Sequence, residues 1–167
     1  MPRTVYIAGP LFSEQDRMLL LQIEKSFTEH GISCFVPHRE VGDLAVLREE
    51  LGAELSRSLI FDSDIDGVEE CIVVCALLDG PDVDSGTAAE MGFAHALGRP
   101  VFGLCTDGFR RGKTMNNVIW GICESGARIY TKIPDLTKAV AEHVAQCVKT
   151  SNKPDFRKRI RNELEAV

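Results

Sequence analysis

The chain lacks several features that would place it in a large class of proteins. No run of apolar residues approaches the roughly 20 that a membrane-spanning helix needs. Basic residues are in the minority, because 19 Lys and Arg stand against 25 Asp and Glu and give a formal net charge of −6. This balance argues against nucleic acid or an anionic membrane as the main partner, since phosphate binding needs a basic surface. A small polar substrate is the more natural ligand.

Two familiar motifs are also missing. None of the six cysteines forms a CxxC pair, and most lie in apolar segments, which favours reduced, buried thiols over a metal or redox site. The GxGxxG fingerprint is absent, which argues against dinucleotide binding. No signal peptide is recognisable at the N-terminus, so we expect a cytoplasmic location.

Strand-like and helix-like segments alternate along the chain. Strands are predicted at residues 4–8, 32–36, 71–78, 100–105 and 127–130. Helices are predicted at residues 14–30, 44–67, 87–97, 116–123 and 136–148. This order predicts an α/β fold with a five-stranded parallel sheet and helices on both faces. We expect one domain over residues 1–150, followed by a polar tail or helix over residues 151–167.

The most informative segment follows the third predicted strand. It groups three aspartates, Asp84 among them, with Gly86 and Glu90. Ligands of open parallel sheets bind beyond the carboxyl ends of the strands, where carboxylates can accept hydrogen bonds from sugar hydroxyls or attack a carbon. A helix dipole is expected to keep Glu90 ionised. The alternative is a T-x-x-E capping box, in which Glu90 only holds the first helical turn against Thr87.

Three other segments offer contacts to a ligand. Pro10 and Phe12 follow Gly9 after the first strand and form either a wall for a planar base or a tight turn. Residues 62–66 hold three aspartates late in the second helix, which form either part of a site or a solvated helix face. Asn116 offers an amide to a hydroxyl, or else caps a helix.

Taken together, four segments resemble the nucleoside 2-deoxyribosyltransferase family. They are, in order, VYIAGPLF at 5–12, DIDGV at 64–68, DSGTAAEMGFA at 84–94 and NNVIWG at 116–121. The resemblance implies a flavodoxin-like fold and an enzyme that exchanges nucleobases on 2′-deoxynucleosides by a retaining double displacement. The expected ligands are small-molecule 2′-deoxynucleosides and free nucleobases, with no nucleic acid, membrane, organic cofactor or metal.

The resemblance also implies roles for individual residues. Glu90 matches the nucleophile, Asp64 the acid that protonates the leaving base, and Tyr6 a tyrosine that orients the nucleophile. Asp84 matches a group that holds the 5′-hydroxyl. Asn116 matches an amide from a neighbouring subunit, which implies a homo-oligomer such as a dimer or hexamer. The other expected substrate-binding residues are Gly9, Pro10, Phe12 and Gly86.

Two alternatives stay open at the level of sequence. One is an N-glycoside hydrolase acting on deoxynucleosides or deoxynucleoside 5′-monophosphates, and the other is a non-catalytic nucleotide-sensing module. The nucleotide hydrolases of this kind tend to carry serine at the place of Asp84 and arginine in the first loop. The acidic Asp84 and the uncharged segment 10–12 therefore favour free nucleosides. Because residues 37–47 match loosely, the preference for purine or pyrimidine stays open, and His38 and Arg39 either contact the base or lie at the surface.

Overall fold

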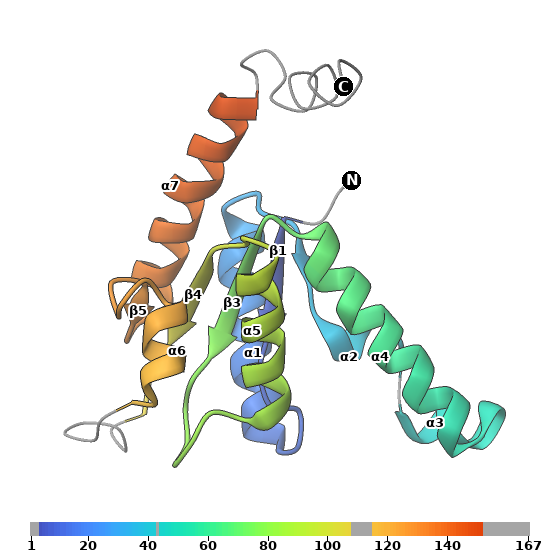
Figure 1. Cartoon of the computed structure of the whole chain (residues 1–167). Coiled ribbons are helices and arrows are strands. Elements are labelled where there is room, and N and C mark those ends of the chain that lie inside the picture. Colours follow the sequence, from blue (N-terminus) through green and yellow to red (C-terminus); the bar gives the residue numbers. More distant parts are fainter. Residues whose placement is uncertain (1–3, 43, 108–114, 152–167) are drawn as a thin grey trace, which may run out of the picture.

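A five-stranded parallel sheet forms the centre of the protein in the computed structural model, which describes residues 4–42, 44–107 and 115–151. The strands follow the spatial order β2-β1-β3-β4-β5 (Figure 1). Their bounds are β1 Val5–Ala8, β2 Cys34–Phe35, β3 Val73–Leu77, β4 Val101–Leu104 and β5 Ile129–Tyr130. This is the flavodoxin-like strand order, so the predicted fold class is confirmed.

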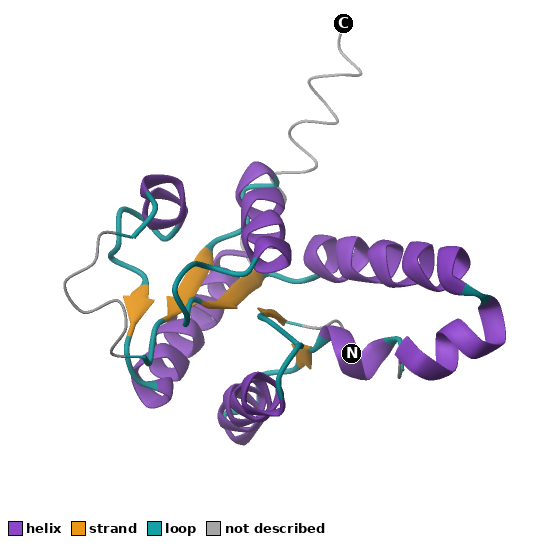
Figure 2. Ribbon diagram, turned by 90° about the horizontal axis from the view of Figure 1, so that it is seen from below, coloured by secondary structure: helices purple, strands orange, loops and turns teal. Residues whose placement is uncertain are grey.

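Helices cover both faces of the sheet (Figure 2). One face packs against α1 (Glu14–Glu29) and α7 (Ile133–Ser151), and the other against α4 (Ala53–Glu70), α5 (Ser85–Ala96) and α6 (Asn117–Ile122). Two short helices, α2 (Pro37–Glu40) and α3 (Leu44–Leu51), lie between β2 and α4 in the chain. None of the helices among the described residues is long and apolar enough to cross a bilayer.

The strand pleat decides which side chains reach which layer. In β1, Val5 and Ile7 belong to the core under α1 and α7, whereas Tyr6 and Ala8 belong to the core under α4, α5 and α6. β3 alternates in the same way and is buried along its whole length, as predicted for a strand covered on both faces. Tyr6 therefore points toward the helices that carry the expected acidic residues.

Three local expectations needed correction. The helix predicted over residues 44–67 is divided at Gly52, whose φ of +82° is readily available only to glycine. Pro37 ends the second strand as expected, but its fixed φ also suits the first position of a helix, and the short helix α2 begins there. The helix predicted from residue 87 starts at Ser85. Most of the predicted tail, residues 152–167, lies outside the described residues.

Helices α3 and α4 form an arm that extends away from the sheet (Figures 1 and 2). Its apolar side chains Leu55, Leu59 and Phe61 are exposed. Near its other end, α4 approaches β2 closely at Gly67, where an added Cβ would lie 2.8 Å from the ring of Phe35. The arm is thus fixed to the domain at the end of α4 that leads into β3.

Candidate active site

A cavity of about 790 Å³ lies between the arm, the loop after β1 and the start of α5. Its size suits a small-molecule ligand. Seven of the nine residues expected from sequence line it: Gly9, Pro10, Phe12, Asp64, Asp84, Gly86 and Glu90. Tyr6 lies directly behind this lining, and Asn116 lies elsewhere.

Glu90 and Tyr6 form the central contact of the site. The Tyr6 hydroxyl donates a hydrogen bond of 2.7 Å to Oε1 of Glu90. Tyr6 is fully buried, and its ring stacks on Phe35 with centroids 5.2 Å apart. Because Tyr6 is fixed within the sheet, its hydroxyl holds the Glu90 carboxyl in one orientation at the cavity wall.

The environment of Glu90 does not keep the carboxyl ionised. Burial raises its pKa to about 8, and the charges of Asp64 and Asp84 add to this effect, whereas the hydrogen bond from Tyr6 opposes it. Burial therefore outweighs the helix dipole, and the expectation that the dipole holds Glu90 ionised is wrong. Glu90 lies in the second turn of α5, beyond the first turn where the dipole is strongest.

Asp84, rather than Glu90, caps α5. Its Oδ2 accepts hydrogen bonds from the backbone N–H and the hydroxyl of Thr87, at 3.0 and 3.2 Å. The capping-box interpretation of Glu90 is therefore wrong. Within the described part of the chain, the hydrogen bonds to the Asp84 side chain all reach Oδ2, so Oδ1 is available to a ligand.

Asp64 projects from α4 into the same cavity. Burial raises the pKa of its carboxyl to about 6. Its Oδ1 is buried and accepts no hydrogen bond from any described residue. A buried carboxyl oxygen without a partner is costly, which indicates that a ligand or water supplies the missing contact.

Several lining residues were missed at the level of sequence. They come from three places, the first turn of α1, the segment from α2 onward and the arm, and are Arg17, Val41, Gly42 and Ile60. Arg17 donates to the backbone carbonyl of Leu11 at 2.6 Å, and its charge also lowers the pKa of His38. Arg17 therefore lines the cavity beside the loop after β1. In the sequence, Arg17 is only a residue in the first turn of a predicted helix. Its position at the cavity follows from the hydrogen bond to Leu11, which the sequence does not indicate.

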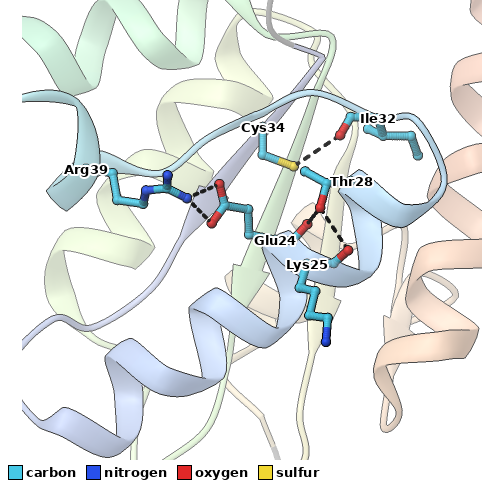
Figure 3. Close-up of polar contacts among 6 residues, drawn as sticks. All are labelled: Glu24, Lys25, Thr28, Ile32, Cys34 and Arg39. Carbon is cyan, nitrogen blue, oxygen red and sulfur yellow. Dashed lines mark hydrogen bonds and ion pairs between the residues drawn. The ribbon is translucent and has the colours of Figure 1, made fainter.

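His38 and Arg39 are neighbours in α2 but make different contacts. His38 lines the cavity, whereas Arg39 places Nη1 2.6 Å from both carboxylate oxygens of Glu24 (Figure 3). The loosely matching stretch thus contributes to the cavity through Pro37, His38, Val41 and Gly42. Phe12 is 85% exposed at the cavity and offers a free aromatic face.

Asn116 caps α6, because its Oδ1 accepts a hydrogen bond from the backbone N–H of Val118 at 2.9 Å. The capping interpretation is confirmed. Asn116 is exposed and does not line the cavity of its own chain. The implied contribution to a neighbouring subunit stays a prediction.

One group of possible metal ligands occurs among the described residues, formed by Asp79, Cys105 and Asp107. It lies in the loops after β3 and β4 and does not line the cavity. Asp79 accepts from the backbone N–H of Thr106, and Asp107 accepts from the backbone N–H of Gly80 at 2.6 Å. These contacts connect the two loops, and the acidic residues of the cavity form no such group among the described residues.

Comparison with known proteins places this geometry in context. The uncharacterized protein UU063 of Ureaplasma parvum serovar 3 is 28% identical over 151 residues, which cover 79% of this chain and 90% of the relative. A 2-deoxyribosyltransferase from Bacillus psychrosaccharolyticus has a similar structure, with a TM-score of 0.65, 21% identity, and 80% and 90% of the two chains covered. The CMP N-glycosidase BcmB from Clostridium botulinum gives a TM-score of 0.55 and 19% identity, with 84% and 99% covered.

Both solved structures are less than 25% identical to this chain, so their similarity shows a common fold and nothing more. The family description "Nucleoside 2-deoxyribosyltransferase" matches residues 5–149, which include every residue discussed at the cavity. With most of the sequence matched, this chain belongs to the nucleoside 2-deoxyribosyltransferase family.

Proposed function

We propose that this protein transfers the 2-deoxyribosyl group between nucleobases, by a retaining double displacement through a glycosyl–Glu90 intermediate. The observation that carries the proposal is the Glu90 carboxyl, held at 2.7 Å by Tyr6 in a cavity that also contains the buried, unpartnered Oδ1 of Asp64. One carboxyl is positioned to attack a carbon, and the other is free to exchange a proton.

The first displacement breaks the bond between the sugar and the base. Ionised Glu90 attacks C1′ of the deoxynucleoside, and the electron pair of the C1′–N bond leaves with the base. Asp64 supplies the proton that a ring nitrogen of the base takes up. Tyr6 is a positioning residue, because it contacts Glu90 and fixes which oxygen faces the sugar.

The second displacement reverses the first with a new base. A nitrogen of the incoming base attacks C1′, the bond to Glu90 breaks, and the ionised Asp64 takes the proton that the new base loses. Two inversions at C1′ give net retention, as in retaining glycosidases, with a nucleobase in place of water.

The sugar end of the site favours a nucleoside over a nucleotide. Asp84 has Oδ1 free to accept a hydrogen bond from the 5′-hydroxyl, whereas a carboxylate would repel a 5′-phosphate. Arg17 is a basic residue in the cavity, where it donates to the backbone carbonyl of Leu11. The proposed donors are therefore free 2′-deoxynucleosides.

The test is a base-exchange assay. The protein is incubated with 2′-deoxyinosine and free adenine, and the products are separated by chromatography. The proposal expects 2′-deoxyadenosine and hypoxanthine with the wild-type protein and no new nucleoside with Glu90→Ala. Absence of turnover with this donor, deoxycytidine and thymidine would contradict the proposal.

A hydrolase is the second candidate function, because one structural neighbour is a CMP N-glycosidase and Arg17 brings a positive charge to the cavity. It differs only in the second displacement, where water attacks C1′. Hypoxanthine and free deoxyribose without 2′-deoxyadenosine would assign hydrolysis. Cleavage of a 5′-monophosphate in preference to the nucleoside would contradict the role given to Asp84.

A further inference from the structure

Besides Oδ1 of Asp64, the cavity wall contains a second buried polar atom without a partner among the described residues, and it belongs to His38. Its Nδ1 is buried and makes no hydrogen bond with any described residue, as is also true of Oδ1 of Asp64. Both residues line the same cavity, and the helices that carry them, α2 and α4, pack against each other. Buried polar groups without partners are rare in folded proteins, so two of them in one cavity indicate polar ligand atoms.

The position of His38 is fixed from both sides. Pro37 starts α2 with a fixed φ, and Arg39 ties the same helix to α1 through its ion pair with Glu24 (Figure 3). Arg39 is therefore occupied outside the cavity while His38 faces it. Ile60 and Phe12 supply apolar surface around the same space, which suits a flat heterocycle.

We infer that His38 is a specificity-determining residue, whose Nδ1 hydrogen-bonds the exocyclic group next to the ring nitrogen that Asp64 protonates. This inference rests on the proposed function and deepens it by naming the substrate class. In a purine, the 6-substituent shares an edge with N7, a nitrogen that can take up a proton as the base leaves. Two polar groups from neighbouring helices suit two neighbouring atoms on that edge.

The chemistry of imidazole determines which substituents fit. A neutral histidine presents Nδ1 as donor in one tautomer and as acceptor in the other. Burial lowers the pKa of His38, the charges of Arg39 and Arg17 lower it further, and that of Glu24 opposes them, so the ring is neutral at neutral pH. The site therefore accepts a 6-oxo group, which needs a donor, as well as a 6-amino group, which needs an acceptor.

The experiment compares three donors that differ only at position 6. These are 2′-deoxyinosine, 2′-deoxyadenosine and purine 2′-deoxyriboside, which carries hydrogen there. For His38→Leu, kcat/KM falls on the order of 10- to 100-fold with the first two donors, as expected for a lost buried hydrogen bond, and stays within about 2-fold with the third. His38→Asn restores most of the loss, since its amide can donate or accept at the position of Nδ1.

Matched controls separate this effect from a loss of folding. His30→Leu makes the same chemical change at the exposed C-cap of α1, and all three donors keep their wild-type rates. His38→Ala replaces His38→Leu if the latter does not fold, as judged by its melting temperature. The inference is overturned if a folded His38→Leu or His38→Ala variant loses the same activity with all three donors. It is also overturned if the variant keeps its full activity with all three.

The same experiment distinguishes failure of this inference from failure of the proposed function. If the wild-type protein turns over the three donors and the His38 variants show the same relative kcat/KM values, only the role of His38 is overturned. No turnover of any donor by the wild-type protein overturns the proposed function and this inference with it.

Discussion

At the scale of single residues, the site is a pair of carboxyls in unequal surroundings. The pKa of Glu90 is raised to about 8 and that of Asp64 to about 6, chiefly by burial. Around neutral pH the two carboxyls together therefore hold one proton, and this proton lies mostly on Glu90. The proposed reaction needs it on Asp64, so only a minor protonation state of the pair is active.

The first prediction concerns the pH dependence of this pair. The kcat/KM of the wild-type protein is expected to rise up to about pH 6 and to fall above about pH 8, because the active state carries a single proton. Asp64→Asn removes the group that must hold that proton. Its kcat/KM falls roughly 10²- to 10⁴-fold at neutral pH and then rises with pH without an alkaline decline.

Initial rates across this pH range test the first prediction. Glu90 ionises at lower pH in Asp64→Asn, because one of the charges that raise its pKa is gone. An alkaline decline that persists in Asp64→Asn would assign the upper limb to another group.

The second prediction concerns Tyr6→Phe. The variant keeps the ring that stacks on Phe35 but loses the hydrogen bond to Glu90, which lowers the pKa of that carboxyl. The pKa of Glu90 therefore rises, and kcat falls on the order of 10-fold or more, as for a lost hydrogen bond to a charged group. In the Asp64→Asn background, the rising limb of the pH profile moves to higher pH. An unmoved limb would show that Tyr6 does not influence the ionisation of Glu90.

A third prediction concerns stability. The pKa of Glu90 is about 8 in the folded protein and 4.5 ordinarily, so ionising it disfavours folding. The free energy of unfolding should fall as pH rises from about 4.5 to about 8, since the folded state holds the proton longer. Glu90→Gln removes this dependence and melts at a higher temperature than the wild type at pH 8, with the difference shrinking toward pH 5. An equal difference at both pH values would contradict the raised pKa.

Much of the site was predictable from sequence, but for unequal reasons. Glu90 and Asp64 follow from the family resemblance, and the alternation of β1 explains why Tyr6 meets them. Arg17 was not assigned to the cavity, and His38 was left open between the base and the surface, because they reach the cavity through a turn before α1 and through a helix of four residues. Such short-range geometry leaves no periodic pattern in the sequence.

At the scale of elements, α4 connects the cavity to the sheet. One turn beyond Asp64, Gly67 lies on the ring of Phe35, which in turn stacks on Tyr6. The interior helices and strands were predicted well because each has an apolar pattern of the right period. The break at Gly52 was less certain, since a single glycine inside a helical pattern is often tolerated.

The fourth prediction compares two helical glycines. In Gly67→Ala the new Cβ lies 2.8 to 2.9 Å from three Phe35 ring atoms, so overpacking costs about 1–3 kcal/mol of unfolding free energy. Displacement of Phe35 also disturbs Tyr6, and kcat falls. Gly92→Ala on α5 meets no atom within 4 Å and gains helix propensity of up to about 1 kcal/mol. Denaturant melts of the two variants should shift in opposite directions, and a shared direction would contradict this packing.

At the scale of the whole molecule, the exposed position of Asn116 matters most. The residue lies on α6, outside the cavity of its own chain, as a contribution to a neighbouring subunit requires. The arm adds the exposed apolar side chains Leu55, Leu59 and Phe61, and grouped exposed apolar side chains are typical of protein–protein contact sites. Both observations are consistent with the proposed homo-oligomer.

The fifth prediction is complementation between two inactive variants. Glu90→Ala lacks the proposed nucleophile, and Asn116→Ala lacks the amide that the neighbour is proposed to provide. If two subunits share each site, unfolding and refolding an equal mixture restores about a quarter of the wild-type activity, because half of the dimers are mixed and each has one intact site. Base exchange measured before and after mixing gives the answer. Activity that stays at the level of the separate variants would place Asn116 outside the partner's site.

The alternation of β1 has a consequence for how this family can diversify. Glu90, the proposed nucleophile, is held by Tyr6, which lies in a strand paired on both sides by β2 and β3. The wall from α2 through the arm is built from helices outside the sheet and supplies His38 and Ile60. Substitutions in the wall that is proposed to contact the base can therefore leave the Tyr6–Glu90 contact unchanged, so a change of substrate need not change the proposed reaction.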